Sequence, residues 1–371
     1  MFRQDRTNPS TAVSNWKGRK DTARAWSSTA VSTWLNGSLF GPDLSCPSYT
    51  AGATNRAGYI AGGYEVANAV RTARTNRLAF SDETMACFEA GTRVGSPTGG
   101  GFANSGTAGY WAAGYAGSSA STDVYKVAFS SDAMSTLSSG MSVSRRQNSG
   151  TGFANSGTAG YLGGGYAASG TTYSNIVDKW AFSDDSRSTL GGTLPRGKYG
   201  IAGFANSGTK GYWAGGYGTA YGSPTNQGFM QEISSIWFSN DSIGTEGATI
   251  PLFSNMGTYE ANGMANSGTA GYICGGYIGP DGVTGQTRVM KLAFSSGTLT
   301  TLSDSLSVGK RNGAAYANSG TAGYSTSGTV NSGTGLTTDK VTFSTDATSV
   351  LSATILIHVE RASGFANTAG L

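Results

Sequence analysis

Residues that could carry nucleophilic or acid–base chemistry are few in this sequence. The single histidine, His358, lies in the apolar stretch TILIHVER. One histidine could serve a Ser–His–Asp or Cys–His site, but no G-x-S-x-G turn or comparable nucleophile segment accompanies it. We therefore interpret His358 as an ordinary strand residue.

Carboxylates offer a second route to catalysis, because a glycosidase needs two of them at a fixed separation. Five aspartates recur at the same place of a repeated motif: Asp82, Asp132, Asp184, Asp241 and Asp346. Such regularity favours a structural role in turns. The candidates for a glycan-active enzyme are the glutamates of an irregular segment: Glu232, Glu246 and Glu260.

The pattern of cysteines and acidic residues indicates no metal or cofactor site. Cys46, Cys87 and Cys274 form no CxxC pair, which predicts neither a disulfide framework nor a zinc site. No calcium loop of the D-x-D-x-D-G kind occurs either. We predict that the chain is not an enzyme, with no catalytic residue, no metal and no cofactor.

Composition indicates folded β structure. The chain has 371 residues, of which 58 are glycine, 11% are aromatic and 12% are charged, with a net charge of +4. Disorder requires few aromatics and a high net charge, so this glycine content is typical of tight turns between strands. Scattered basic residues argue against a nucleic-acid partner. Residues 1–20 hold no apolar signal segment and no long apolar run occurs, so we expect no membrane span.

An internal repeat determines the predicted fold. The segment GFANSGTAGYWAAGY at 101–115 returns at 152–166, 203–217, 263–277 and 315–329, with a degenerate copy at 51–64. Its aligned tyrosines are Tyr59, Tyr110, Tyr161, Tyr212, Tyr272 and Tyr324. They are separated by roughly 51, 51, 51, 60 and 52 residues, within the range of propeller blades. We interpret them as core residues packed between blades, in preference to platforms for sugars.

Each repeat predicts about four short strands. G-F-A-N and A-G-Y are apolar runs joined by Asn-Ser-Gly-Thr, which predicts a hairpin. K-x-A-F-S with its turn and a T-L-containing stretch supply two more strands. The repeated basic residue is expected to be an exposed charge on an outer strand, with a ring facing an anionic partner as the alternative: Arg77, Lys126, Lys179, Lys291 and Lys340. The final G-F-A-N at 364–367 predicts a strand that completes the first blade.

These features resemble the kelch repeat, with its Gly-Gly pair, aromatic residue and closing arginine. Gly-Gly pairs stand at 62–63, 164–165, 215–216 and 275–276, while the copies at 113–114 and 327–328 depart from the pattern. The resemblance implies an all-β fold, a six-bladed kelch-like β-propeller over residues 49–371, with seven blades as the weaker alternative. It implies no particular function, because the fold hosts both enzymes and binding modules.

The near-identical A-N-S-G-T-A-G-Y repeats are also similar to those of virion proteins of tailed phages, marine ones especially. That resemblance implies a tail, fibre or capsid appendage with adhesion or decoration roles. The expected localisation is the virion, assembled in the host cytoplasm. A homo-oligomer is compatible with this class of protein.

Departures from the repeat are where we expect function. The fourth copy is longer, with an insertion at 218–231, and we predict ligand or partner contact by Tyr221, Asn226 and Phe229. Residues 1–48 lack the repeat and hold Trp16, Trp26, Trp34 and Arg24, residue types that anchor interfaces. We predict that this arm attaches the propeller to other virion proteins; a cap packed under the propeller is the alternative.

The sequence thus predicts a non-enzymatic structural or adhesion protein of a phage particle, displayed through residues 1–48, with a host surface glycan as a possible ligand. A lectin-like propeller whose aromatic rims bind carbohydrate is the second hypothesis. A glycan-active enzyme is the third.

Overall fold

The computed structural model describes residues 56–67, 70–72, 74–89, 100–112, 114–116, 119–146, 152–167, 172–219, 227–251, 257–277, 285–331 and 335–369. These residues form strands and turns, and no helix occurs among them. The all-β prediction is confirmed. Within the same ranges, no helix has the length and apolar character needed to cross a membrane.

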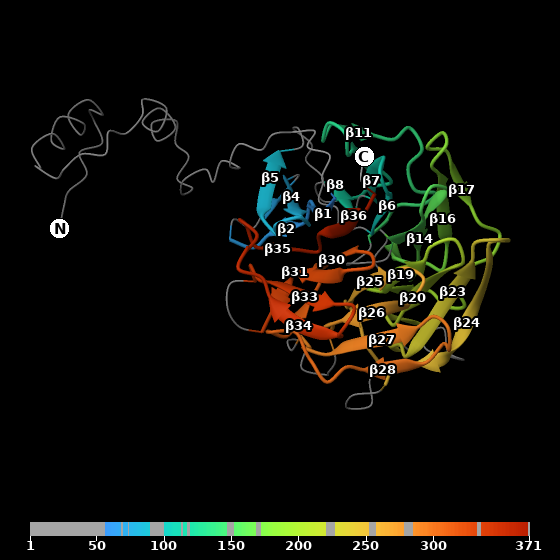
Figure 1. Ribbon diagram of the computed structural model, residues 1–371. Helices are drawn as coiled ribbons and strands as arrows, with labels where there is room; N and C mark the ends of the chain where they lie inside the picture. Colours follow the sequence, from blue (N-terminus) through green and yellow to red (C-terminus); the bar gives the residue numbers. More distant parts are fainter. Residues whose placement is uncertain are drawn as a thin grey trace, which may run out of the picture. The chain divides into compact units, whose positions relative to one another are not determined.

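Six antiparallel four-stranded sheets make up most of this part of the chain (Figure 1). Sheet 1 contains β36 (Ser363–Asn367), β1 (Ala57–Ala61), β4 (Arg74–Ala79) and β5 (Met85–Glu89). Sheet 2 contains β6 (Gly101–Asn104), β7 (Ala108–Ala112), β10 (Val124–Ala128) and β11 (Met134–Thr136). Sheet 3 contains β13 (Gly152–Asn155), β14 (Ala159–Gly163), β16 (Val177–Ala181) and β17 (Arg187–Thr189).

The remaining sheets repeat this order. Sheet 4 contains β19 (Ala202–Asn206), β20 (Lys210–Ala214), β23 (Glu232–Trp237) and β24 (Ser242–Thr249). Sheet 5 contains β25 (Asn262–Asn266), β26 (Ala270–Cys274), β27 (Val289–Ala293) and β28 (Leu299–Thr301). Sheet 6 contains β30 (Ala314–Asn318), β31 (Ala322–Thr326), β33 (Thr338–Thr342) and β34 (Ala347–Val350).

Short ribbons join neighbouring sheets. They are β2 (Tyr64–Glu65) with β3 (Val70–Arg71) and β35 (Val359–Glu360), β8 (Tyr115–Ala116) with β9 (Ser119–Ala120), β12 (Arg145–Arg146) with β15 (Tyr166–Ala167), β18 (Lys198–Tyr199) with β21 (Tyr217–Thr219) and β22 (Gln227–Phe229), and β29 (Lys310–Arg311) with β32 (Thr329–Val330). Most pair a segment that follows one sheet with a segment of the next sheet.

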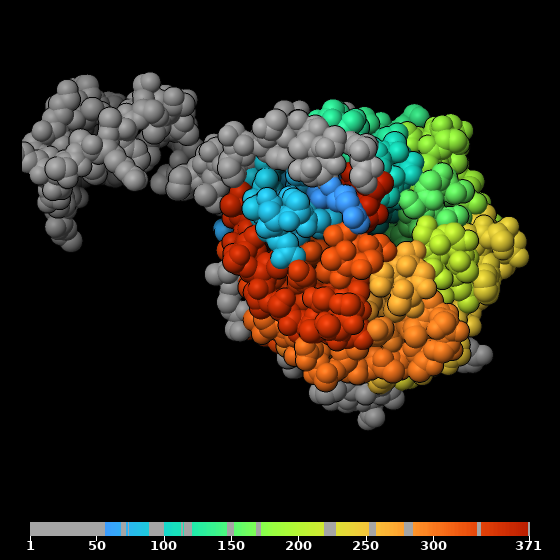
Figure 2. All heavy atoms as spheres, in the orientation of Figure 1, coloured from blue at the N-terminus to red at the C-terminus, as the bar shows by residue number. Residues whose placement is uncertain are grey.

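Sheet 1 is assembled from distant parts of the sequence. The strand β36 pairs antiparallel with β1, placing Phe365 opposite Tyr59. In the space-filling view the red β36 segment lies between the blue β1 region and the teal β6 region (Figure 2). The G-F-A-N segment near the C-terminus thus supplies the strand that the degenerate first copy lacks.

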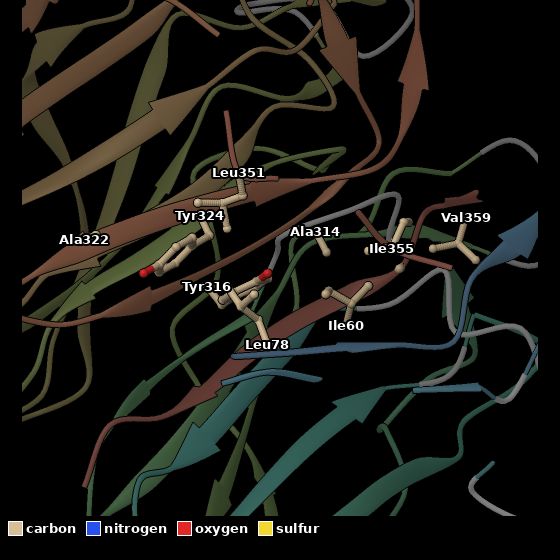
Figure 3. Packing of buried hydrophobic residues seen from close by; sticks show 10 residues of the cluster. Ile60, Leu78, Ala314, Tyr316, Ala322, Tyr324, Leu351, Ile355 and Val359 are labelled. Carbon is tan, nitrogen blue, oxygen red and sulfur yellow. The ribbon is translucent and has the colours of Figure 1, made fainter. Parts of the chain in front are cut away.

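The cores lie between sheets rather than within them. Each of the six hydrophobic clusters draws residues from two adjacent sheets, and one of them joins sheet 6 to sheet 1. Figure 3 shows this cluster, in which Ile60 and Leu78 of sheet 1 meet Tyr316 and Tyr324 of sheet 6. The aligned tyrosines are all at most 5% exposed, which confirms their predicted place in the core.

The A-G-Y glycine is required by this packing. The phenyl ring of Phe102 in sheet 2 covers Gly160 of sheet 3, where a Cβ atom would lie 2.0 Å from the ring. Five equivalent contacts follow the sheets in order: Phe153 on Gly211, Phe204 on Gly271, Met264 on Gly323, Tyr316 on Gly58 and Phe365 on Gly109. Each sheet therefore covers the glycine of the next, and sheet 6 covers that of sheet 1.

The Asn-Ser-Gly-Thr hairpins also bond across sheets. Asn104 pairs with Ala108, which leaves a three-residue loop with Gly106 at a φ of 85°. The Asn104 Oδ1 accepts a hydrogen bond from the Gly157 amide of sheet 3 at 3.1 Å. The same bond joins Gly208 to Asn155, Gly268 to Asn206, Gly320 to Asn266 and Gly106 to Asn367, and the Arg56 guanidinium donates to Asn318. These contacts explain why the hairpin sequence recurs from copy to copy.

The turns between third and fourth strands carry a second contact between sheets. Lys126 of sheet 2 pairs with Asp185 of sheet 3 at 2.6 Å, and the Tyr110 hydroxyl donates to the same carboxylate at 2.8 Å. Equivalent pairs are Lys179 with Asp241, Lys291 with Asp346 and Lys340 with Glu83. The expectation of an exposed charge is wrong for these residues: the four lysine side chains are only 23–25% exposed, and Arg77, the fifth repeated basic residue, is 4% exposed.

Fully buried ion pairs lie at two of the joints, which are the contacts between neighbouring sheets. Arg145 in β12 lies 2.8 Å from Asp178 of sheet 3, and Lys310 in β29 lies 2.6 Å from Asp339 of sheet 6. At the joint between sheets 3 and 4, the buried Lys198 ammonium donates to the Ser234 hydroxyl at 2.9 Å. The joints therefore differ in chemistry although the backbones repeat.

The cysteines differ from the sequence-based expectation at one position. Cys87 is disulfide-bonded, whereas Cys274 is a free, fully buried thiol. Spacing alone gave no sign of this bond, because a disulfide depends on which strands become neighbours in space.

Candidate functional site

Seven aromatic side chains gather on the connections of sheets 3, 4 and 5. They lie where a second strand leads to the third, or where a fourth strand leads to the next sheet. We call this set the aromatic band: Tyr166, Tyr173, Tyr199, Tyr217, Phe229, Tyr259 and Tyr277.

The Gly-Gly pair of the repeat positions part of the band. Gly164 and Gly165 have φ angles of 72° and 117°, in the region that favours glycine. The Gly165 amide donates to the Lys198 carbonyl at 2.8 Å, so the chain turns closely against the next connection. This turn brings Tyr166 within 5.3 Å of Tyr199, measured between ring centroids.

The rings contact one another continuously across the three sheets. Tyr173 stacks on Tyr199 at 5.6 Å, and Tyr199 meets Tyr259 edge-on at 5.1 Å. Phe229 lies 5.4 Å from Tyr277 at the far end. All of these separations are typical of favourable aromatic pairs. Tyr259 and Tyr277 are buried and the other five rings are half-buried, so the band presents part of its ring surface to solvent.

Arginines lie at both ends of the band. The Arg146 guanidinium sits 4.4 Å from the Tyr166 ring centroid, and that of Arg311 sits 5.2 Å from Tyr277. Arg311 also pairs with the buried carboxylate of Glu260 at 3.0 Å. Cation–π contacts of this kind hold a guanidinium flat against a ring and leave its edge for hydrogen bonds.

A chain of backbone hydrogen bonds includes Gly200 and Glu260, which directly follow Tyr199 and Tyr259 of the band. The Glu260 amide donates to Gly200, the Asn312 amide to Glu260, and the Arg361 amide to Asn312, at 2.8, 3.0 and 2.6 Å. All four residues have positive φ, which is uncommon for Glu, Asn and Arg. Left-handed non-glycine residues tend to cluster at functional sites.

The phenols of Tyr173, Tyr199 and Tyr259 are protonated at neutral pH. Burial raises the pKa of Tyr173 to about 12, and burial also raises the pKa of Tyr199 and Tyr259. Protonated hydroxyls can donate hydrogen bonds, and that of Tyr259 already bonds to Tyr199 and Glu260. Partly exposed ring faces together with hydroxyl donors suit a ligand that has both apolar ring faces and hydroxyl groups.

The three glutamates considered as glycosidase acids are each held by cations. Lys198 and Arg196 lie 3.4 Å from Glu232, Arg311 binds Glu260, and Lys210 lies 2.5 Å from Glu246. Burial disfavours the charge on Glu232, but Lys198, Ser234 and Arg196 outweigh it and hold its pKa below the usual value. A general acid needs a raised pKa, so Glu232 is poorly suited to that role.

Of the predicted contact residues, Phe229 lies in the aromatic band, where β22 pairs it with Tyr217. Tyr221 and Asn226 lie outside the described residues. The same holds for the predicted anchors Trp16, Trp26, Trp34 and Arg24 and for the whole of residues 1–48.

Sequence reasoning missed the other six rings of the band. Tyr166, Tyr217 and Tyr277 directly follow Gly-Gly pairs and were set aside as part of the repeat. Tyr173, Tyr199 and Tyr259 have no equivalent in most copies, and this enrichment in the third and fourth copies was the available signal.

Comparison with known proteins adds no relative: no protein-family model and no curated protein sequence matches this chain. Within the ranges that the structure covers, no group of three or more metal-ligating side chains occurs. The geometry of the band is therefore the feature that bears on function.

Proposed function

We propose that this chain is a non-enzymatic adhesion protein of a phage particle, built on a closed six-bladed kelch-like β-propeller that binds a surface glycan. The closed ring is supported by the contacts between sheets. Each four-stranded sheet covers the A-G-Y glycine of the next, the hydrophobic clusters join every adjacent pair, and β36 pairs with β1. Four-stranded sheets repeated in this way are typical of propellers.

The observation that carries the binding function is the aromatic band. Aromatic faces bind the apolar faces of sugar rings, and phenol hydroxyls bond to sugar hydroxyls. A band that crosses three adjacent sheets offers successive rings to a chain of sugars. Its glutamates are held by cations, which favours binding over hydrolysis.

A phage particle is the setting that the A-N-S-G-T-A-G-Y resemblance favours. In this setting residues 1–48 attach the propeller to other virion proteins, and the aromatic band recognises a host glycan.

Glycan binding is tested with matched tyrosine variants of the full chain. We expect a glycan array to identify a bound oligosaccharide, and Tyr217→Ala to weaken its binding about tenfold, since one stacking ring is lost. Tyr64→Ala is the control, because Tyr64 follows the Gly-Gly pair of sheet 1, outside the band. Absence of any glycan binding, or equal loss in both variants, would contradict the proposal.

Attachment is tested by deleting residues 1–48. Phage assembled with the truncated protein should lack it, as measured by mass spectrometry of purified particles. Incorporation of the truncated protein at the wild-type level would overturn the anchoring role.

A further inference from the structure

We infer that the ligand of the aromatic band is an anionic polysaccharide, whose acidic groups are bound by Arg146 and Arg288. This inference rests on the proposed glycan-binding function and specifies the class of glycan.

Charge beside the band is the first reason. Among the described residues that contact the band or lie next to it in the chain, cations outnumber carboxylates: Arg146, Arg196, Lys198, Arg288 and Arg311 stand against Glu232 and Glu260. Glu232 is shared by Arg196 and Lys198, and Glu260 is bound by Arg311. The surroundings of the band therefore retain an excess of positive charge, which attracts an anionic ligand.

Arg288 gives the second reason. Its guanidinium donates to two neutral oxygens, the Pro251 carbonyl at 3.4 Å and the Thr258 hydroxyl at 3.3 Å, and it forms no ion pair within the described ranges. Thr258 directly precedes Tyr259 of the band. Half-buried beside the band, this guanidinium bonds to neutral groups alone among the described residues, and a ligand carboxylate or sulfate would supply a counter-charge.

Arg146 gives the third. Its guanidinium lies over the Tyr166 ring at the other end of the band. A planar guanidinium on a ring can bind a carboxylate or sulfate through two parallel hydrogen bonds while a sugar ring stacks beside it. An acidic polysaccharide repeats this combination of sugar ring and anionic group along its length.

Single-stranded nucleic acid also combines rings with negative charge, but it carries a phosphate at every nucleotide. Proteins that bind it line a groove with cations along the backbone. Here the cations are few and two of the five share Glu232, so an anion at each ring would lack a partner. Sparse acidic groups on a polysaccharide match this arrangement better.

The test measures binding of the full chain to polygalacturonate, dextran sulfate, neutral dextran and oligo(dT) at low and high salt. We expect polygalacturonate or dextran sulfate to bind more tightly than dextran, with affinity that falls as salt rises. Arg146→Gln and Arg288→Gln should each weaken that binding about five- to tenfold, the effect of losing one charge-assisted contact. Lys126→Gln, which removes the same charge far from the band, should leave it unchanged.

The outcomes distinguish failure of this inference from failure of the proposed glycan-binding function. Equal, salt-independent binding of acidic and neutral polymers would overturn this inference and leave the glycan-binding function standing. Tighter binding of oligo(dT) than of either acidic polysaccharide would overturn it in favour of nucleic acid. If the protein binds none of these polysaccharides and no glycan on the array, the proposed function itself is overturned. The salt dependence of the wild-type protein decides the matter even if an arginine variant does not fold.

Discussion

Pairing of β36 with β1 makes Phe365 a decisive residue. Its ring covers Gly109 of sheet 2 and stacks on Tyr59 and Trp111 at 5.4 and 5.8 Å. Only 4% of Phe365 is exposed. Truncation of such a ring to alanine removes its burial and leaves a cavity, at a cost of about 3–5 kcal/mol in the free energy of unfolding. In a domain of this size that corresponds to a fall in Tm of about 4–7 °C.

The matched control is Phe102→Ala. Phe102 is 2% exposed and covers Gly160 in the same way, but both sheets that it joins are built from continuous sequence. If β36 docks as firmly as an internal strand, the two variants should lose similar stability in thermal melts followed by circular dichroism. A Phe365→Ala protein with unchanged Tm, beside a destabilised Phe102→Ala protein, would refute closure by this strand.

Three further predictions concern the joints between sheets. Asp178→Asn leaves the fully buried Arg145 without its counter-charge, and we expect urea denaturation to show a loss of about 3–5 kcal/mol; a loss below 1 kcal/mol would mean that the site admits water. Gly211→Ala places a methyl group against the phenyl ring of the preceding sheet and should lower the free energy of unfolding by about 1–3 kcal/mol in the same assay. Gly244→Ala, with open space around the glycine, should leave it almost unchanged, and equal effects would contradict the packing. Burial lowers the pKa of Lys198 to about 8, so between pH 7 and 9.5 the unfolded chain binds more protons at this group and its contribution to stability rises with pH by about 2 kcal/mol. The difference in unfolding free energy between wild type and Lys198→Met should shift by that amount over this range, and a pH-independent difference would show that the lysine titrates normally.

Much of the fold could be predicted because the sequence repeats. The G-F-A-N, A-G-Y and K-x-A-F segments contribute strands and the Asn-Ser-Gly-Thr loops are hairpins, whereas His358, expected in a strand, directly precedes β35. The partners of the repeated side chains could not be predicted. Lys126 binds Asp185 one unit further along the chain, and identical copies give no sign of whether a residue meets its own unit, the next or the preceding one.

The candidate site was predicted only at Phe229. Reasoning from irregular length pointed to the insertion in the fourth copy, and this residue does lie in the band. Tyr199 and Tyr259 come from separate connections, and only the packing of adjacent sheets brings their rings to 5.1 Å. No spacing rule within one copy could have placed them together.

The buried pairs at the joints have a consequence for how such a chain can change by recombination. Hairpins that bond identically to either neighbour would let one unit be exchanged for another. The pairing of Arg145 with Asp178, and of Lys310 with Asp339, works against such an exchange, because a unit inserted beside the wrong neighbour would bury a charge alone. The joints thus pair specific neighbours and keep near-identical modules in a fixed order. The aromatic band depends on that order, because three particular modules must be adjacent to form it.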